Sequence, residues 1–285
     1  MLSLTRDEID GLITGIESKN RSSELGFFSK PVRVYRGDKA YIVKLYLPVR
    51  NYPFINFIVK NHEDYITELK RAGLNIPETV ILTRQKGKKH QLVIIQDSFR
   101  DEDLVRNLIT EAGKEKLTDL ISMLFTDVIN FNRRKKNSIA TGFHPTLRNY
   151  AYHEGKLWFF DTFPPMLMEQ RELNGVILRM SPYGGWLRKI IPLLLINKVS
   201  DEYYQFDKMF TGIVGSCCRL RPADAGLILN FSREYVAGSE QLTNAEKESI
   251  LRMVNKPPRL SQLWILIRKL SGNTGKPNIS TPTFS

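Results

Sequence analysis

The spacing of the apolar residues changes once along this chain, near residue 97, and the change restricts the folds that the chain can adopt. Before it, four short stretches of alternating or β-branched residues predict strands, at 32–35, 41–47, 80–84 and 91–96. Residues 54–72 repeat at helical spacing and stop at Gly73. After residue 101 the spacing is mostly helical, at 101–111, 114–132, 203–220, 223–237, 243–255 and 260–270. The sequence therefore predicts an α+β protein with a small β-rich lobe followed by a larger, mostly helical lobe.

A hinge at 96–101 separates the two predicted lobes. The N-lobe spans residues 1–97 and contains an N-terminal helix, an antiparallel sheet and one long helix. The C-lobe spans residues 98–271, and residues 272–285, rich in Gly, Pro, Ser and Thr, predict a flexible tail. A chain of 285 residues buries about three quarters of its unfolded surface, so it needs neither a disulfide nor a metal to fold.

The cysteines and the apolar runs predict the compartment. Cys217 and Cys218 are the two cysteines of the chain and are adjacent, so we expect buried thiols on a helix in a reducing compartment. The first residues show no basic region followed by an apolar core, and the longest apolar run, at 190–196, contains Pro192. We therefore expect a cytoplasmic protein without a transmembrane segment.

The charge of the chain favours anionic partners. Lys and Arg number 42 against 30 Asp and Glu, a net charge of +12, which suits nucleotides, phosphorylated metabolites, nucleic acid or acidic membranes. Two basic runs, at 84–90 and 133–136, are either solvated loops or nucleic-acid contacts, and neither has interleaved aromatic residues that stack on bases. A basic helix around Trp264, at 258–270, either packs on the larger lobe or lies on a membrane or a partner.

A polar residue stands at each end of a predicted hairpin. Strands at 150–152 and 157–160 flank a turn at 153–156, and pairing across that turn places Asn149 opposite Asp161. Residues opposite each other in a hairpin have Cβ atoms about 5 Å apart. Amide and carboxylate oxygens completed by phosphates suit Mg²⁺. The pair predicts a magnesium site or, alternatively, a polar hairpin end that caps its own backbone.

Lys44 lies in a strand whose two faces are both largely apolar, which predicts that its side chain is partly buried. A buried lysine needs an anionic partner, and the following helix offers Glu63, Asp64 and Glu68. The alternative is a lysine on an edge strand that points to water.

His144 lies in the loop at 141–149, between a long amphipathic helix and the hairpin. An imidazole near a carboxylate can act as a general base close to neutral pH. The alternative is a loop histidine that only makes hydrogen bonds.

The order of these features resembles the protein-kinase-like superfamily over residues 25–163, and more loosely to residue 270. Its aminoglycoside and choline kinase branch and uncharacterised bacterial kinase-like proteins are closest in style. The sequence Tyr-Ile-Val-Lys ending at Lys44 is similar to the strand with the phosphate-binding lysine. The resemblance implies that Glu63 is the helix partner of this lysine, with Glu68 as the alternative.

The resemblance also covers the hinge and the metal site. The stretch Ile-Ile-Gln-Asp, in which Gln96 stands, is similar to the hinge strand that meets adenine. Asn149 corresponds to the metal-binding asparagine of the family, and Asp161 to its metal-binding aspartate. The implied cofactors are ATP and Mg²⁺.

The chain departs from the family pattern at three places. His144 stands five residues before Asn149, where the family has its catalytic aspartate. The loop at 25–32, which would cover the phosphates, retains one glycine, Gly26. Asp161 is followed by Thr-Phe-Pro-Pro in place of Phe-Gly. The resemblance therefore supports the fold and the metal site better than it supports ordinary hydroxyl phosphorylation.

Three functions follow as hypotheses. The first is an ATP- and Mg²⁺-dependent phosphotransferase acting on a small molecule or a peptide, with Lys44, His144 and Asp161 as catalytic residues and nucleotidyl transfer as a variant. The alternative is a pseudokinase that holds nucleotide, or acts as a scaffold, without phosphoryl transfer. A nucleic-acid binder ranks third because no recognition module is visible, so nucleic acid is not an expected partner.

Overall fold

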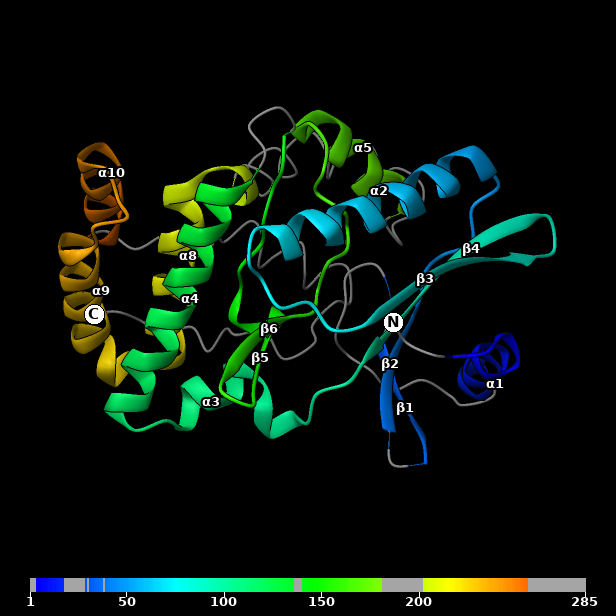
Figure 1. The fold of residues 1–285 in the computed structure, drawn as a ribbon, viewed down its shortest axis with the longest axis horizontal. Coiled ribbons are helices and arrows are strands. Elements are labelled where there is room, and N and C mark those ends of the chain that lie inside the picture. The colour runs from blue at the N-terminus through cyan, green and yellow to red at the C-terminus, as the bar shows by residue number, and fades with distance from the viewer. Residues whose placement is uncertain are drawn as a thin grey trace.

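The computed structural model describes residues 4–17, 29, 31–37, 39–135, 140–180 and 202–255. Four features predicted above lie outside the described residues: Gly26 with most of its loop, the apolar run at 190–196, the helix around Trp264, and the tail. Figure 1 shows a sheet flanked by two helices at one end of the molecule and a group of helices at the other end.

The small lobe is built on an antiparallel sheet of four strands in the order β1-β2-β4-β3. These strands are β1 (Pro31–Arg36), β2 (Lys39–Leu45), β3 (Thr79–Lys86) and β4 (Lys89–Asp97). The β1–β2 and β3–β4 turns contain Gly37 at φ 54° and Gly87 at φ 61°, a left-handed conformation that glycine adopts without strain. Strand β2 is central, and its Lys44 pairs with Ile94 of β4.

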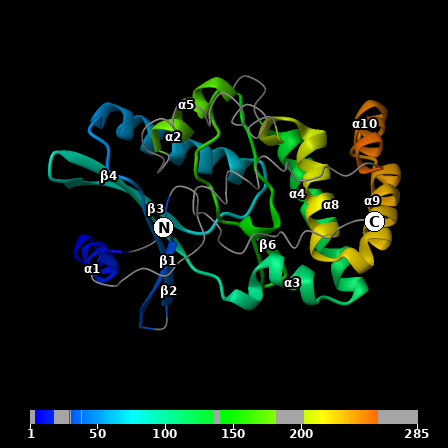
Figure 2. The same cartoon turned by 180° about the vertical axis from the view of Figure 1, so that it is seen from behind.

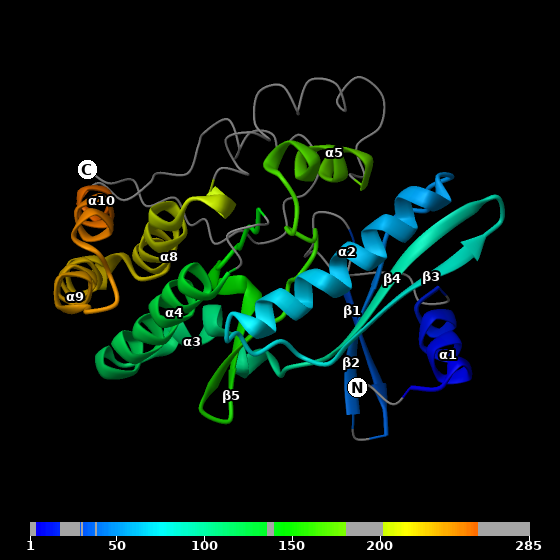
Figure 3. The ribbon, with the colours of Figure 1, turned by 45° about the horizontal axis from the view of Figure 1, so that its top comes forward.

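Both faces of this sheet are covered by a helix, α1 (Arg6–Glu17) on one face and α2 (Tyr52–Arg71) on the other. Leu12 of α1 belongs to one apolar cluster with Val43 and Ile95. Ile58 of α2 belongs to a second cluster with Ile94. Figure 3 shows the two helices on opposite sides of the strands. This double cover explains why β2 is apolar on both faces, since successive residues of a strand point to opposite sides.

In the residues that the structure describes, the large lobe is helical apart from one hairpin. Its helices are η1 (Asp101–Asp103), α3 (Val105–Glu111), α4 (Lys114–Arg134), α5 (Gln170–Met180), α8 (Phe206–Leu220), η4 (Pro222–Asp224), α9 (Ala225–Gly238) and α10 (Asn244–Val254). Helices α4 and α8 pack closely, and the fully buried rings of Phe125 and Phe210 stack with centroids 3.9 Å apart. Figure 2 shows from behind how α9 and α10 pack outside α8. Cys217 and Cys218 are buried in α8 as free thiols, as predicted.

The chain passes from the sheet to the helices through three residues, because β4 ends at Asp97 and η1 begins at Asp101. The molecule is therefore an α+β protein with a small lobe built on a sheet and a larger, mostly helical lobe, as predicted. The division of the chain into domains at residues 97 and 98 stays a prediction. Within the described ranges, no helix combines the length and the apolar character that crossing a bilayer demands.

Candidate functional site

An ion pair joins the two lobes. Lys44 lies on the α2 side of the sheet, and its Nζ atom donates to Oδ1 of Asp161 at 3.1 Å. The lysine is 7% exposed, whereas the aspartate side chain is 41% exposed. The alternative of a lysine pointing to water is therefore wrong. The exposed half of the carboxylate remains open toward solvent, where a ligand can reach it.

The structure brings neither predicted glutamate to Lys44. Glu63 is exposed on α2, and Glu68 pairs with Arg71 through a contact of 2.7 Å. His62 faces the lysine instead. It is fully buried, and its pKa is lowered to about 3, first by burial and second by the Lys44 ammonium. The imidazole is therefore neutral at pH 7.

His62 also holds the segment that follows Asp161. Its Nε2 atom lies 2.7 Å from the hydroxyl oxygen of Thr162, inside the core. The Phe163 ring then packs against Tyr46 of the loop after β2, with centroids 4.3 Å apart, and edge-on against His62 at 5.8 Å. Helix α2 thus holds Thr162 and Phe163, the two residues that follow Asp161, and through them it fixes the position of Asp161.

Asn149 ends the short helix η2 (Leu147–Asn149) and is 2% exposed. Its Nδ2 atom donates to the carbonyl oxygen of His144 at 3.1 Å. Because a carbonyl can only accept, this hydrogen bond assigns the amide nitrogen and leaves Oδ1 as the opposite end of the group. The side chain is therefore oriented by the loop that contains His144.

The hairpin register differs by one residue from the prediction. Strands β5 (Tyr150–His153) and β6 (Lys156–Phe159) pair Tyr150 with Phe159, and the backbone N–H of Phe160 donates to the Asn149 carbonyl at 3.0 Å. Asn149 is therefore opposite residue 160, and Asp161 lies one position further on. The two-residue loop, Glu154 at φ 50° and Gly155 at φ 76°, pairs His153 with Lys156 and so sets this register.

Burial keeps the His144 imidazole uncharged. Its ring packs against Tyr203 with centroids 4.3 Å apart. Burial lowers the pKa of His144 to about 4, the Asp161 carboxylate opposes this shift, and the Arg148 guanidinium adds to it. The His144 carbonyl accepts a hydrogen bond from the Asn149 amide, so the loop that contains His144 adjoins the start of the hairpin that leads to Asp161.

The hinge is fastened to the sheet by Arg33 of β1. Its guanidinium donates to the hydroxyl of Ser98 at 3.0 Å, to the carbonyl of Phe99 at 2.7 Å and to Asp101 at 2.8 Å. Gln96, predicted to meet a nucleotide, is 2% exposed and donates through Nε2 to the Thr79 hydroxyl at 3.1 Å. The structure therefore directs the Gln96 amide toward β3.

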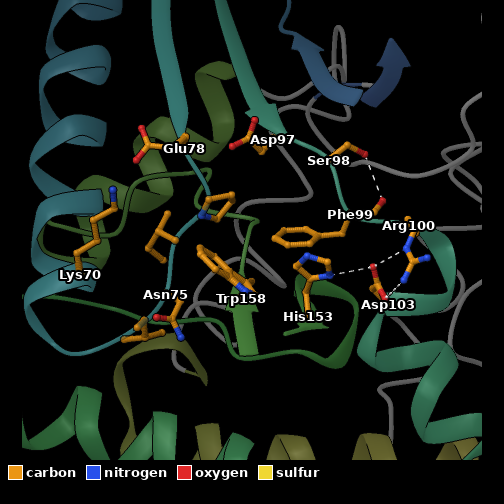
Figure 4. A pocket seen from close by; sticks show the side chains of 13 residues that line it. Lys70, Asn75, Glu78, Asp97, Ser98, Phe99, Arg100, Asp103, His153 and Trp158 are labelled. Carbon is orange, nitrogen blue, oxygen red and sulfur yellow. Dashed lines mark hydrogen bonds and ion pairs between the residues drawn. The ribbon is translucent and has the colours of Figure 1, made fainter. Parts of the chain in front are cut away.

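A pocket of about 520 Å³ lies between the end of α2, the hinge and the β5–β6 hairpin. Figure 4 shows Phe99, His153 and Trp158 close together in it, with Glu78 and Asp97 near its edge. The pKa of Asp97 is raised by burial and then by the neighbouring Glu78 carboxylate. Lys44, Asn149 and Asp161 do not line this pocket, so it is separate from the candidate site.

Sequence reasoning missed His62, although a signal was present. His62 stands in the apolar stripe of α2 with Ile58, Tyr65 and Leu69, all buried in the structure. A titratable residue within a buried stripe is a candidate for contact with other buried polar groups. Of the acidic residues of this helix, Glu63 and Asp64 are exposed, and Glu68 is buried but pairs with Arg71.

Comparisons with known proteins give a family and a weak structural likeness. A family described as a family of unknown function, DUF6206, matches residues 14–275. Comparison with curated proteins gives no match. A solved structure, WaaP in complex with acyl carrier protein, is similar with a TM-score of 0.38 and 12% identity, over 92% of this chain and 87% of that chain. A likeness at this level supports no conclusion about activity.

Proposed function

The chain belongs to the DUF6206 family, whose function is unknown, and from its site we propose that it is an ATP- and Mg²⁺-dependent phosphotransferase acting on a small molecule or a peptide. The observation that carries this proposal is the Lys44–Asp161 ion pair, 3.1 Å long and formed between the two lobes. The fixed amide of Asn149 stands at the start of the same hairpin. A cation, a carboxylate and an amide oxygen are the groups that phosphoryl transfer uses for positioning and charge neutralisation.

The residues present fit a magnesium ion. Asp161 offers a half-exposed carboxylate, and the Asn149 amide has its nitrogen held by the His144 carbonyl, which leaves an oxygen to coordinate. Mg²⁺ is commonly bound by one or two such protein ligands together with substrate phosphates. When bound, the ion would neutralise charge on the phosphates. Lys44 would then exchange its contact with Asp161 for a phosphate oxygen.

His144 is proposed to receive the proton of the acceptor hydroxyl. With a pKa of about 4, its imidazole has nearly the basicity of an unperturbed aspartate, whose pKa is about 3.9. It differs from an aspartate in charge, because its basic form is neutral. We therefore propose a base that accepts the proton without adding a negative charge beside the phosphates.

The second candidate function, a pseudokinase, is favoured by the same neutral histidines. His144 replaces a carboxylate at the base position, and His62 faces Lys44 without a negative charge. A site of this kind can bind nucleotide and fail to transfer the phosphate. Nucleic-acid binding, the third hypothesis, has the net charge of +12 as its support and would weaken steeply with salt.

Calorimetric titration with Mg²⁺ and a non-hydrolysable ATP analogue tests the binding site. Binding should require Mg²⁺, and Asp161→Asn should weaken it at least about tenfold, a loss of about 1.4 kcal/mol. Asp119→Asn, which changes an exposed carboxylate on α4, is the matched control and should bind as the unmodified chain does. Binding that needs no Mg²⁺, or that survives Asp161→Asn, would contradict the proposed site.

Turnover separates the two candidates. The purified protein is given ATP, Mg²⁺ and a cell extract that contains acceptor molecules. Phosphate transfer that disappears in Asp161→Asn and persists in Asp119→Asn would support the phosphotransferase. Mg²⁺-dependent binding without any ATP consumption would select the pseudokinase.

A further inference from the structure

Exposed apolar side chains gather at one end of the small lobe. The large apolar side chains that are exposed among the described residues are Tyr35 at 70%, Leu47 at 45%, Tyr52 at 49% and Phe57 at 49%. Three of the four lie within residues 47–57, in the loop after β2 and the first turns of α2. Single exposed apolar residues are ordinary, whereas three large ones within eleven residues of the chain indicate an interaction site.

The basic turn between β3 and β4 lies beside this group. The backbones of Val49 and His90 exchange hydrogen bonds of 2.9 and 2.7 Å, and the rings of Tyr52 and His90 pack with centroids 4.7 Å apart. These contacts place the exposed lysines of the turn next to the exposed apolar side chains. We call the combined region the tip surface, made of Leu47, Arg50, Tyr52, Phe57, Lys60, Lys86, Lys88 and Lys89, all exposed.

Within its own two chain segments, the tip surface carries cationic charge alone. Residues 47–62 and 84–90 contain no Asp or Glu, whereas Lys and Arg occupy positions 50, 60, 84, 86, 88 and 89. On α2 the surface ends at Lys60, because the exposed carboxylates Glu63 and Asp64 lie one helical turn further on. Cationic side chains around apolar ones are complementary to a lipid bilayer with anionic headgroups above an apolar hydrocarbon core.

We propose that the tip surface docks the protein on an anionic lipid bilayer. Figure 1 shows the start of α2 and the β3–β4 turn at the end of the molecule opposite α9 and α10, so they can meet a flat surface. Tyr52 and Phe57 enter the headgroup region, where aromatic side chains are favoured. The lysines contact lipid phosphates. Leu47 adds aliphatic surface, and the basic run at 84–90 has no interleaved aromatic residues that stack on bases, which together favour lipid over nucleic acid as the occupant.

The position of the tip surface gives docking a consequence for the candidate site. Tyr52 and His62 are on one helix, ten positions apart, which corresponds to about 15 Å along its axis. Docking would therefore hold the Lys44–Asp161 ion pair roughly 15 Å or less beyond the docked end of α2. The docking itself does not depend on phosphoryl transfer, since no residue of the tip surface belongs to the candidate site.

Sedimentation of the full chain with vesicles tests the proposal. Phosphatidylcholine vesicles are prepared with and without phosphatidylglycerol, and the bound fraction is measured at low and high salt. The protein should bind the anionic vesicles and leave the neutral ones, and binding should weaken with salt because exposed charges are screened. Equal binding to both vesicles, or binding to neither, would overturn the proposal.

Matched variants locate the contact. Lys88→Glu with Lys89→Glu should weaken binding at least about tenfold, since each lysine near an anionic surface contributes about fivefold. Tyr52→Ser with Phe57→Ser should also weaken it about tenfold. Thermal unfolding confirms that each variant is folded, which is expected because the changed side chains are exposed.

The controls change the same residue types elsewhere. Tyr35→Ser alters the most exposed aromatic of the described residues, and Lys156→Glu alters an exposed lysine of the β5–β6 hairpin. Both should bind vesicles as the unmodified chain does, and a loss equal to that of the tip variants would refute the assignment. A parallel titration with single-stranded DNA gives the remaining outcome: tighter binding to DNA than to vesicles would assign the surface to nucleic acid and end the lipid proposal.

Discussion

Replacing Asp127 by asparagine should stabilise the protein, and more so at higher pH. Asp127 lies on α4 behind the β5 strand, and burial raises its pKa from 3.8 to about 7. The Tyr150 hydroxyl is close enough to lower this pKa slightly, although it makes no well-aligned hydrogen bond. The folded protein therefore binds a proton at Asp127 more tightly than the unfolded chain does.

The sign and size of the effect follow from this difference. Stability from the raised pKa is fully present below about pH 3.8 and is lost as the pH rises toward 7. At about 1.4 kcal/mol per pKa unit, the full loss is about 4 kcal/mol. Over the accessible range from about pH 5 to about pH 8, the loss is about 2–3 kcal/mol. Asparagine carries no charge, so Asp127→Asn escapes this loss.

The assay is denaturant unfolding of the wild type and of Asp127→Asn across this pH range. The quantity to compare is the difference between their unfolding free energies as a function of pH. The wild-type curve alone is not sufficient, because the lowered pKa values of His62 and His144 make stability fall as the pH drops below about 6.5. These histidines cancel in the difference. Asp119→Asn, on the same helix but exposed, is the control. Curves of wild type and Asp127→Asn that stay parallel within about 0.5 kcal/mol would refute the buried, protonated carboxyl.

Three further predictions concern the core and the two histidines. Phe125→Ala should lower the unfolding free energy by about 3–5 kcal/mol in a denaturant titration, because a buried, stacked ring leaves a cavity; a loss below about 1 kcal/mol would contradict the α4–α8 packing. Glu63→Ala should change stability by less than about 0.5 kcal/mol, whereas His62→Ala should cost about 1–3 kcal/mol because it leaves a buried hydroxyl unpaired; similar losses would argue against the placement of His62. His144 should stay neutral, so its ring resonances should show no inflection near pH 6.5, and an inflection there would mean that the imidazole is solvated.

The strands of the small lobe were predictable because local rules determine them. Alternation in 41–47 and a turn at Gly37 specify a hairpin without reference to the rest of the chain. The same alternation indicated that Lys44 is buried, since both faces of its strand are apolar. What the strand could not reveal is the occupant of each face, because α1 reaches the sheet through a contact distant in sequence.

Two predictions about the site, the helix partner of Lys44 and the hairpin partner of Asn149, were each wrong by one position in the sequence. Successive residues of a helix are rotated by about 100°, so the step from Glu63 to His62 moves a side chain from solvent to the core. In the hairpin, the observed pairing of Tyr150 with Phe159 makes residue 160, and not Asp161, the partner of Asn149. Pattern reasoning located both elements, but side-chain direction depends on a register that only the packed structure fixes.

The central claim is that Asn149 and Asp161 hold one divalent ion opposite Lys44. A crystal grown with Mn²⁺ in place of Mg²⁺ and a non-hydrolysable ATP analogue tests it most directly, since Mn²⁺ gives an anomalous signal that identifies its position. We predict one anomalous peak about 2.0–2.3 Å from Oδ1 of Asn149 and from a carboxylate oxygen of Asp161, with the Lys44 ammonium moved from Asp161 onto a phosphate. A peak that contacts neither side chain, or an unbroken Lys44–Asp161 ion pair beside bound nucleotide, would contradict the account.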